Sequence, residues 1–163
     1  LSVYRYKTGR YTFSLPLMLG AILAGADAET VERLSTWGEL QGVVFQIRDD
    51  QLGIMGETDE IGKPSGSDIT ANKQTLHRLH LLNRVEDTQW QDVAGCFGAA
   101  EITSGQIERV REALEKTGTL ALLEERIASL RAQARSLLAD MDLSAKGRAL
   151  FDRIDEYNAG RTV

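Results

Sequence analysis

Apolar residues recur at three- and four-residue spacing along nearly the whole of this chain, and prolines occur only at Pro16 and Pro64. This spacing is typical of one face of an α-helix, so it predicts an all-α protein. The longest predicted helix covers residues 28–55 and follows Asp27, which is suited to begin a helix. At a rise of about 1.5 Å per residue it would span about 40 Å, enough to cross a whole domain.

Shorter helices are predicted before and after this long one. We expect them at residues 1–24, 69–83, 87–100, 103–116, 120–141 and 144–157. The first should be kinked near Pro16, because proline removes a backbone hydrogen-bond donor. Composition predicts a loop at residues 56–67, with Asp68 as the N-cap of the helix after it and Ser144 as a weaker cap further on. No internal repeat or domain boundary is apparent in the 163 residues.

The overall charge and hydrophobicity exclude several classes of partner. A formal charge of −5 argues against a broad nucleic-acid or anionic-membrane surface. No apolar run approaches the roughly 18 residues of a membrane span, and the start lacks a signal peptide, so we expect a cytoplasmic protein. The chain begins with Leu1 rather than methionine, which suggests that an N-terminal portion is missing.

Two adjacent carboxylates, Asp49 and Asp50, lie near the end of the long predicted helix. Acids are unfavourable at a helix C-terminus because of the helix dipole, unless a cation lies close by. Mg²⁺ needs few protein carboxylates, since it keeps several waters. Gln46, three or four residues earlier, shares a helix face with one or both acids. The pair therefore suits a Mg²⁺ site, although it could also be ordinary solvated surface.

Three lysines could supply positive charge to the same chemistry. Lys63 lies in the glycine-rich segment after the acids, Lys73 opens the next predicted helix, and Lys7 and Thr8 lie in the first helix. Each lysine alone could simply extend into solvent. Together with carboxylates and a divalent cation, they suit a Mg²⁺–diphosphate group.

Histidine and cysteine offer weaker candidates. His77 and His80 are three residues apart, but no third metal ligand is near them in the sequence, so we interpret them as surface or interface residues. Cys96 is the only cysteine, which excludes a disulfide within the chain and a cysteine metal cluster. We expect it to be a small buried residue.

The ordered blocks KT, GAILAG, GELQGVVFQIRDD, GKPSGSDI and NKQT closely resemble the C-terminal half of trans-isoprenyl diphosphate synthases, the polyprenyl synthetase family. The resemblance implies the all-α isoprenoid synthase fold, with residues 1–163 forming the C-terminal part of a single polyprenyl synthetase domain. It implies Mg²⁺ as cofactor and a homodimer. The implied reaction joins isopentenyl diphosphate to an allylic prenyl diphosphate and gives a short-chain product of the farnesyl or geranylgeranyl class.

The resemblance also implies roles for individual residues. Asp49 would bind Mg²⁺ on the allylic diphosphate, with Asp50 supporting the metal's water shell and Asp68 acting one layer further out. The diphosphate would be contacted by Lys7, Lys63 and Lys73. Thr8 and Gln46, with the Lys7 carbonyl, would face the developing allylic carbocation, and Phe45 would line the neighbouring homoallylic site.

The chain departs from the family pattern in three ways. The second aspartate-rich motif, DDxxD, ends here in Gly53, so we expect a tuned or weakened metal site. Asn72 stands where the family often has glycine, which puts little in doubt. The first aspartate-rich motif is absent, so we expect this chain alone to be inactive.

Two alternatives remain beside the synthase interpretation. The parent protein could be a non-catalytic regulatory subunit of a heteromeric synthase, where degraded acidic motifs are tolerated. A class I terpene cyclase of the same fold is less favoured, because the paired lysines around GKPSGSD suit transferases. Product length is set upstream of the first motif in this family, so this sequence does not determine it.

Overall fold

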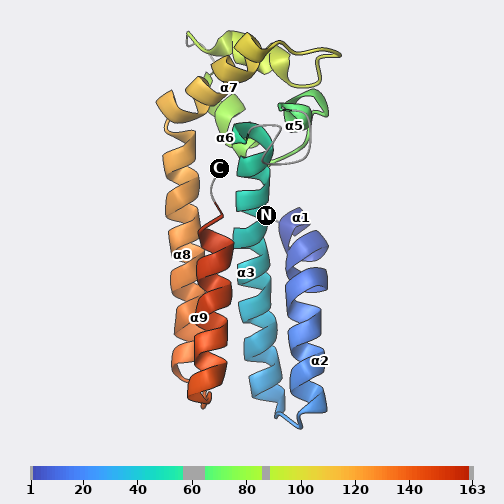
Figure 1. Cartoon of the computed structure of the whole chain (residues 1–163), viewed down its shortest axis with the longest axis vertical. Coiled ribbons are helices and arrows are strands. Elements are labelled where there is room, and N and C mark those ends of the chain that lie inside the picture. Colours follow the sequence, from blue (N-terminus) through green and yellow to red (C-terminus); the bar gives the residue numbers. More distant parts are fainter. Residues whose placement is uncertain (1, 57–64, 86–88, 162–163) are drawn as a thin grey trace. The chain divides into compact units, whose positions relative to one another are not determined.

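A computed structural model describes residues 2–56, 65–85 and 89–161, and these residues are helical or irregular with no β-strand (Figure 1). The elements in chain order are α1 (Ser2–Tyr4), the π-helix η1 (Arg5–Ser14), α2 (Leu15–Leu23), α3 (Ala28–Met55), α5 (Ser67–Thr70), α6 (Leu76–Val85), the 3₁₀-helix η2 (Gln91–Cys96), α7 (Ser104–Lys116), α8 (Thr119–Ala139) and α9 (Ala145–Ala159). No helix among the described residues is both long and apolar enough to cross a membrane.

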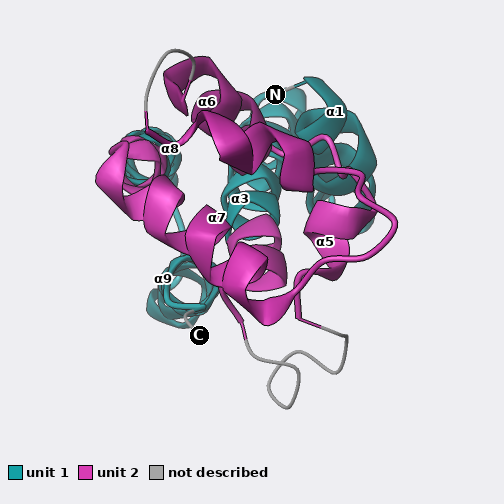
Figure 2. Ribbon diagram, turned by 90° about the horizontal axis from the view of Figure 1, so that it is seen from above, with its two compact units in different colours: residues 1–48, 126–161 teal, residues 49–125, 162–163 magenta. Residues whose placement is uncertain are grey.

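The chain divides into two compact units, coloured separately in Figure 2. The first contains residues 1–48 and 126–161, and the second contains residues 49–125 and 162–163. Helix α3 begins in the first unit and ends in the second, and α8 runs from the second into the first. Each unit has its own hydrophobic core.

The core of the first unit joins α2, α3, α8 and α9. Figure 1 shows α2 beside the N-terminal part of α3, and α9 beside α8. Trp37 of α3 is 1% exposed and meets the ring of Phe151 edge-on, with centroids 4.7 Å apart. Ala134 and Leu138 of α8 complete the contact. Aromatic pairs in this geometry add about 0.5–1.5 kcal/mol beyond the burial of their surface.

A buried carboxylate holds α9 against the neighbouring helices of the first unit. Asp155 accepts hydrogen bonds from Gln41 of α3 at 2.8 Å, from Arg131 at 2.9 Å and from Arg135 at 2.9 Å. Asn158 donates to the side-chain oxygen of Gln41 at 3.0 Å. Burial raises the pKa of Asp155, but these hydrogen bonds and the charge of Arg131 outweigh it, and the pKa lies below its ordinary 3.8.

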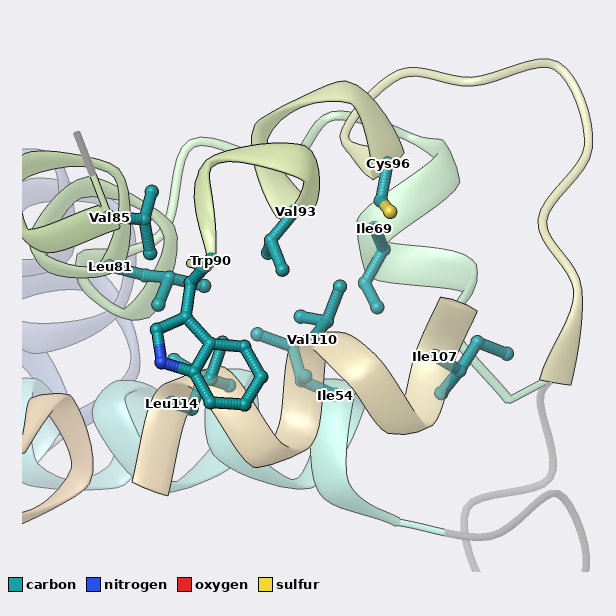
Figure 3. Close-up of a cluster of buried hydrophobic side chains, with 11 residues drawn as sticks. Ile54, Ile69, Leu81, Val85, Trp90, Val93, Cys96, Ile107, Val110 and Leu114 are labelled. Carbon is teal, nitrogen blue, oxygen red and sulfur yellow. The ribbon is translucent and has the colours of Figure 1, made fainter. Parts of the chain in front are cut away.

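The core of the second unit gathers the end of α3, α5, α6, η2 and α7 (Figure 3). Ile54 and Ile69 are both nearly fully buried in it, beside Val110 and Leu114 of α7. Ile54 lies one helical turn after Asp50, and Ile69 follows Asp68. Burial of the two isoleucines in one cluster therefore brings the end of α3 and the start of α5 together.

The longest predicted helix is confirmed, since α3 covers Ala28–Met55 as expected. Asp27 begins it as predicted, with its carboxylate accepting from the Thr30 N–H at 2.7 Å. Ser144 likewise begins α9, accepting from the Gly147 N–H at 3.1 Å. The predicted kink near Pro16 is replaced by a run of wide π-turns before it, and Pro16 lies in the first turn of α2, where its missing donor is tolerated.

The helix predicted at residues 69–83 is wrong in its continuity. The structure has two helices there, α5 and α6, separated by Asn72 with a φ of +49°. Asp68 is not the N-cap, since Gly66 holds that position with a φ of +77° and Asp68 lies in the first turn of α5. Of the helix predicted at 87–100, only the short η2 is present among the described residues. His77 is fully buried rather than on the surface.

Candidate functional site

The predicted site residues fall into two groups, one in each unit. Lys7, Thr8, Phe45 and Gln46 belong to the first unit, whereas Asp49, Asp50, Asp68 and Lys73 belong to the second. The last predicted residue, Lys63, lies outside the described residues. Each group is built by local packing within its own unit.

In the first unit, a direct hydrogen bond joins Thr8 and Gln46. The buried Thr8 hydroxyl donates to the Gln46 side-chain oxygen at 2.6 Å. Because its proton is engaged, the Thr8 oxygen can present only lone pairs to any other group. Lys7, the preceding residue, is exposed. The structure therefore brings Thr8 and Gln46 together and leaves Lys7 exposed.

Glycines allow η1 to approach α3 closely enough for this bond. A Cβ added at Gly42 would lie 2.8 Å from the Gly9 backbone nitrogen and closer still to its Cα. A Cβ at Gly38 would lie 2.7 Å from the Cα of Ser14. Neither distance is compatible with a real side chain, so the two helices touch through backbone. Gln46 follows Gly42 by one turn, which sets it opposite Thr8.

Phe45 has an arginine over its ring. The guanidinium of Arg161 lies 4.3 Å from the ring centroid, within the range of a cation–π contact. The ring centroid of Phe13 lies 5.5 Å from that of Phe45. Buried Arg48 donates to the carbonyl of Ala159 at 2.9 Å and so fixes the end of α9 just before Arg161. Sequence reasoning missed both arginines, because residues 48 and 161 are far apart in the chain.

In the second unit, one lysine joins two of the predicted carboxylates. The ammonium of Lys73 lies 3.0 Å from an oxygen of Asp50 and 2.8 Å from an oxygen of Asp68. The side chain of Asp50 is 1% exposed and that of Asp68 14%, whereas Lys73 is 36% exposed. Asp49 is half-buried. Of the adjacent acids, Asp49 is thus the more accessible, and Asp50 is an inward-facing partner of Lys73.

The backbone after α5 explains how Lys73 returns to Asp68. The N–H of Lys73 donates to the carbonyl of Asp68 at 3.1 Å, and the N–H of Asn72 donates to the carbonyl of Ile69 at 3.0 Å. This pair of bonds is a Schellman motif, which needs a left-handed residue at the position of Asn72. Asparagine tolerates that conformation better than other non-glycine residues. Asn72 therefore adopts a left-handed conformation, which is also readily available to glycine, the residue often found here in the family that the sequence resembles.

The two carboxylates keep Lys73 charged. Partial burial lowers the pKa of Lys73, but the hydrogen bond to Asp68 and the charge of Asp50 outweigh it, and the pKa lies above its ordinary 10.5. An ammonium has three N–H donors, and these two contacts occupy two of them. The third can be offered to an anionic ligand.

Gly53 lies directly against Asp68. A Cβ added at Gly53 would be 2.9 Å from the carboxyl carbon of Asp68 and closer still to one of its oxygens. Position 53 is where the resembled DDxxD motif has its last acid. In this chain the space beside that position is filled by the carboxylate of Asp68.

Arg111 of α7 is a further residue that the sequence analysis missed. It is buried, and it donates to the carbonyls of Ile54 and Gly56 at 3.0 Å each and to the Ser65 hydroxyl at 2.9 Å. These contacts satisfy carbonyls at the end of α3. The signal was present in the pattern, because Arg111 occupies an i+4 position after Ile107 on the apolar face of α7.

The carboxylates of the second unit can bind Mg²⁺ if waters and a phosphate ligand complete its coordination. The described residues contain no cluster of three or more His, Cys, Asp or Glu side chains placed to hold a metal. Mg²⁺, however, is commonly bound by one or two carboxylates together with waters and substrate phosphates. The half-buried Asp49 beside the inward-facing Asp50 offers hard oxygen ligands of that kind. The residues present therefore fit a cation shared with a phosphate ligand.

Comparison with known proteins gives concordant results from sequence and structure. The polyprenyl synthetase family profile matches residues 1–117. Geranylfarnesyl diphosphate synthase of Natronomonas pharaonis is 31% identical over 162 residues, covering 99% of this chain and 45% of that protein. Nonaprenyl diphosphate synthase of Mycobacterium tuberculosis is 32% identical over 167 residues, covering 99% and 47%.

Among solved structures, geranylgeranyl pyrophosphate synthase of Corynebacterium glutamicum, crystallised with isoprenyl diphosphate and magnesium, superposes with a TM-score of 0.89 at 32% identity. The match covers 99% of this chain and 46% of that one, so this chain spans about half the length of the relatives it matches. The expected all-α synthase fold is confirmed over this length. The chain belongs to the polyprenyl synthetase family, which comprises the trans-prenyl diphosphate synthases.

Proposed function

We propose that this chain forms the second aspartate-rich side of a Mg²⁺-dependent trans-prenyltransferase site that joins isopentenyl diphosphate to an allylic prenyl diphosphate. The observation that carries the proposal is that the Lys73 ammonium contacts both Asp50 and Asp68. Asp50 is next in the chain to Asp49, the more accessible of the two adjacent acids. This arrangement holds one ammonium beside hard oxygen ligands, which is what a metal-bound diphosphate requires.

In this proposal Asp49 is the direct Mg²⁺ ligand, and Asp50 holds Lys73 in place instead of facing solvent. When bound, Mg²⁺ supplies positive charge to the departing diphosphate. Lys73 offers its remaining N–H to a diphosphate oxygen, and its raised pKa keeps it cationic at neutral pH. Lys63 and Lys7 are proposed as further diphosphate contacts. Stabilising charge that develops as the C–O bond breaks lowers the barrier to ionisation.

The group in the first unit is proposed to act on the hydrocarbon part of the substrates. The Thr8 hydroxyl donates to Gln46, so its lone pairs are what it presents to an allylic cation. Phe45 is proposed to line the homoallylic site. Arg161, which lies over its ring, adds a positive charge suited to a second diphosphate.

We propose a short-chain product of the farnesyl or geranylgeranyl class and assembly as a homodimer. The matched relatives carry names from farnesyl to nonaprenyl diphosphate synthase. Reversed-phase chromatography of the extracted products measures the chain length. Analytical ultracentrifugation measures the assembly.

Binding and turnover test the proposal separately. Calorimetry of the 163-residue chain with inorganic pyrophosphate should show affinity that depends on Mg²⁺. Replacing Asp49 by alanine should weaken the affinity for pyrophosphate by more than about tenfold. Loss of a group that only supports a metal ligand already weakens metal binding by about tenfold or more, and Asp49 is proposed as a ligand itself. Asp140→Ala, an exposed acid in the first unit, is the matched control and should bind like wild type.

Turnover is measured in a protein that joins this chain to a segment carrying the first aspartate-rich motif, with isopentenyl and geranyl diphosphates as substrates. Elongation that requires Mg²⁺ and Asp49 supports the enzyme. Unchanged turnover in Asp49→Ala would show that Asp49 is not part of the proposed site. Complete inactivity with intact pyrophosphate binding would favour the regulatory-subunit alternative, for which the glycine at position 53 is the supporting observation.

A further inference from the structure

Two arginines of η1, five residues apart, bind the same glutamate of α3. Arg5 donates to one carboxylate oxygen of Glu39 at 3.0 Å, and Arg10 donates to the other at 2.7 Å. The side chain of Glu39 is 11% exposed, whereas both arginine side chains are more than half exposed. Each oxygen of the largely buried carboxylate therefore has its own cationic partner, and a buried charge needs such partners.

The spacing of the two arginines matches the wide turns of η1. In an α-helix, with about 3.6 residues per turn, residues five apart point about 140° away from each other. In a π-helix each N–H binds the carbonyl five residues earlier, so residues five apart lie nearly above one another. The N–H of Leu15 binds the carbonyl of Arg10 in this way. The wide-turn register therefore lets Arg5 and Arg10 approach one carboxylate from the same side.

The backbone contacts between η1 and α3 follow the same five-residue step. A Cβ added to Gly9 would lie 3.0 Å from the carbonyl oxygen of Glu39. Five residues later, Ser14 meets Gly38, whose added Cβ would lie 2.7 Å from the Cα of Ser14. An α-helical η1 would turn either Gly9 or Ser14 away from α3, because the two residues would no longer share a face.

We propose that Glu39 is a positioning residue: it holds η1 in the wide-turn register, and this register sets the Thr8 hydroxyl against Gln46. π-Turns are rare and occur mostly as insertions within α-helices, frequently at functional sites. Here they lie between α1 and α2, with Thr8 buried among them. Loss of the charge at position 39 should let η1 relax to an α-helix and turn Thr8 away from Gln46.

The part of this inference that concerns the register stands on contacts within the first unit, whereas the part that concerns catalysis rests on the proposed function. In that function Thr8 presents its lone pairs to an allylic cation because its proton is given to Gln46. Glu39 has no contact with substrate assigned to it and acts through Thr8. Its loss should therefore matter to turnover only while the Thr8 hydroxyl is present.

NMR couplings across hydrogen bonds test the register, since they identify the carbonyl that each N–H binds. In the wild-type 163-residue chain, the Leu15 N–H should couple to the Arg10 carbonyl. Glu39→Gln keeps the size of the side chain but removes its charge, and Leu15 should then couple to the Tyr11 carbonyl, four residues back. Glu29→Gln, the matched control, removes the same charge from an exposed ion pair of α3 and should leave the Arg10 coupling in place.

A second variant keeps this test decisive if Glu39→Gln does not fold. Methionine at positions 5, 10 and 39 together leaves no unpaired charge, and such replacement of an ion-pair group by apolar residues is often neutral for stability. Its Leu15 N–H should also couple to the Tyr11 carbonyl. An Arg10 coupling that persists in Glu39→Gln, or in the triple variant if Glu39→Gln is unfolded, would overturn the proposal.

Turnover tests the catalytic part, in the protein that also carries the first aspartate-rich motif, with both diphosphate substrates at saturation. Glu39→Gln should lower kcat by at least about tenfold, since a misplacement of about 1 Å can cost about 100-fold. In a Thr8→Val background the same change should have no further effect. An unchanged kcat, or an equal loss in both backgrounds, would overturn the positioning role. Full turnover by Thr8→Val, with a register that still depends on Glu39, would refute the proposed role of Thr8 and retain that of Glu39 in the fold.

Discussion

Gly42→Ala is the substitution for which the structure predicts the largest effect from the smallest change. The added methyl group would enter the contact between α3 and η1, where its carbon would lie 2.8 Å from the Gly9 nitrogen and closer still to its Cα. Gly20→Ala is the matched control. Gly20 is also a glycine within a helix of the first unit, but nothing lies within 4 Å of its added Cβ.

The magnitude follows from what the two variants share and what they do not. Alanine in place of a helical glycine stabilises by about 0.5–1 kcal/mol, and both variants gain this. Ordinary contacts of a Cβ begin at 3.4 Å, so the backbones at Gly42 and Gly9 must separate by at least 0.6 Å, the difference between 3.4 and 2.8. Overpacking of this kind costs about 1–3 kcal/mol.

The separation also stretches the 2.6 Å hydrogen bond between Thr8 and Gln46, one turn further along α3. Losing that bond costs about 0.5–1.5 kcal/mol. Because the helix-propensity gain cancels between the variants, Gly42→Ala should be less stable than Gly20→Ala by about 1.5–4.5 kcal/mol. In a protein of this size each 1 kcal/mol shifts the melting temperature by about 2–4 °C.

Urea unfolding followed by far-ultraviolet circular dichroism compares the variants, and thermal melts provide the second measure. Gly20→Ala should unfold at or above the wild-type midpoint, and Gly42→Ala clearly below it. If Gly42→Ala instead rises together with Gly20→Ala, then η1 and α3 are not in backbone contact. The glycine contact would then not be what lets Thr8 reach Gln46.

Three other predictions concern single side chains. Lys73→Met should lower the free energy of unfolding by about 1–3 kcal/mol in urea titrations, since the 1% exposed Asp50 loses a charged partner. An unchanged free energy of unfolding would show that the ion pair between Lys73 and Asp50 does not stabilise the fold. Asp155 has a folded pKa below 3.8, so the stability it contributes is present above that pH and is lost as the pH falls through the lower, folded value. Thermal melts of wild type should therefore decline more steeply below pH 3.8 than those of Asp155→Asn, and parallel curves would contradict this assignment. Burial, with the nearby charge of Asp92, raises the pKa of the Cys96 thiol above its ordinary 9.0, so a disulfide reagent should react slowly in buffer and rapidly in urea; rapid reaction in buffer would show that the thiol is accessible.

The sequence predicted α3 well because the signals for it are local. Apolar spacing sets its length, and Asp27 and Gly56 mark its ends. The break at Asn72 was not predicted, since asparagine is compatible with helix and becomes left-handed here through the bonds that follow α5. The wide turns of η1 leave no mark on side-chain spacing either. They concern which carbonyl each N–H reaches, and side-chain patterns do not encode that.

The candidate site shows the same division. Motif order was sufficient to select Asp49, Asp50 and Lys73, and the structure brings the last two into contact. The closeness of Gly53 to Asp68 could not be predicted, because it depends on how α3 and α5 meet in the second core. A glycine that looks like a lost acid in the sequence is, in space, the neighbour of another acid.

The contacts of Arg111 bear on how the chain can vary in evolution and in engineering. One guanidinium binds Gly56 and Ser65, the two described residues that flank segment 57–64. Because both residues are held by a third element, α7, replacing Arg111 with a shorter side chain would release the end of α3 and Ser65 together. We therefore expect position 111 to tolerate few substitutions.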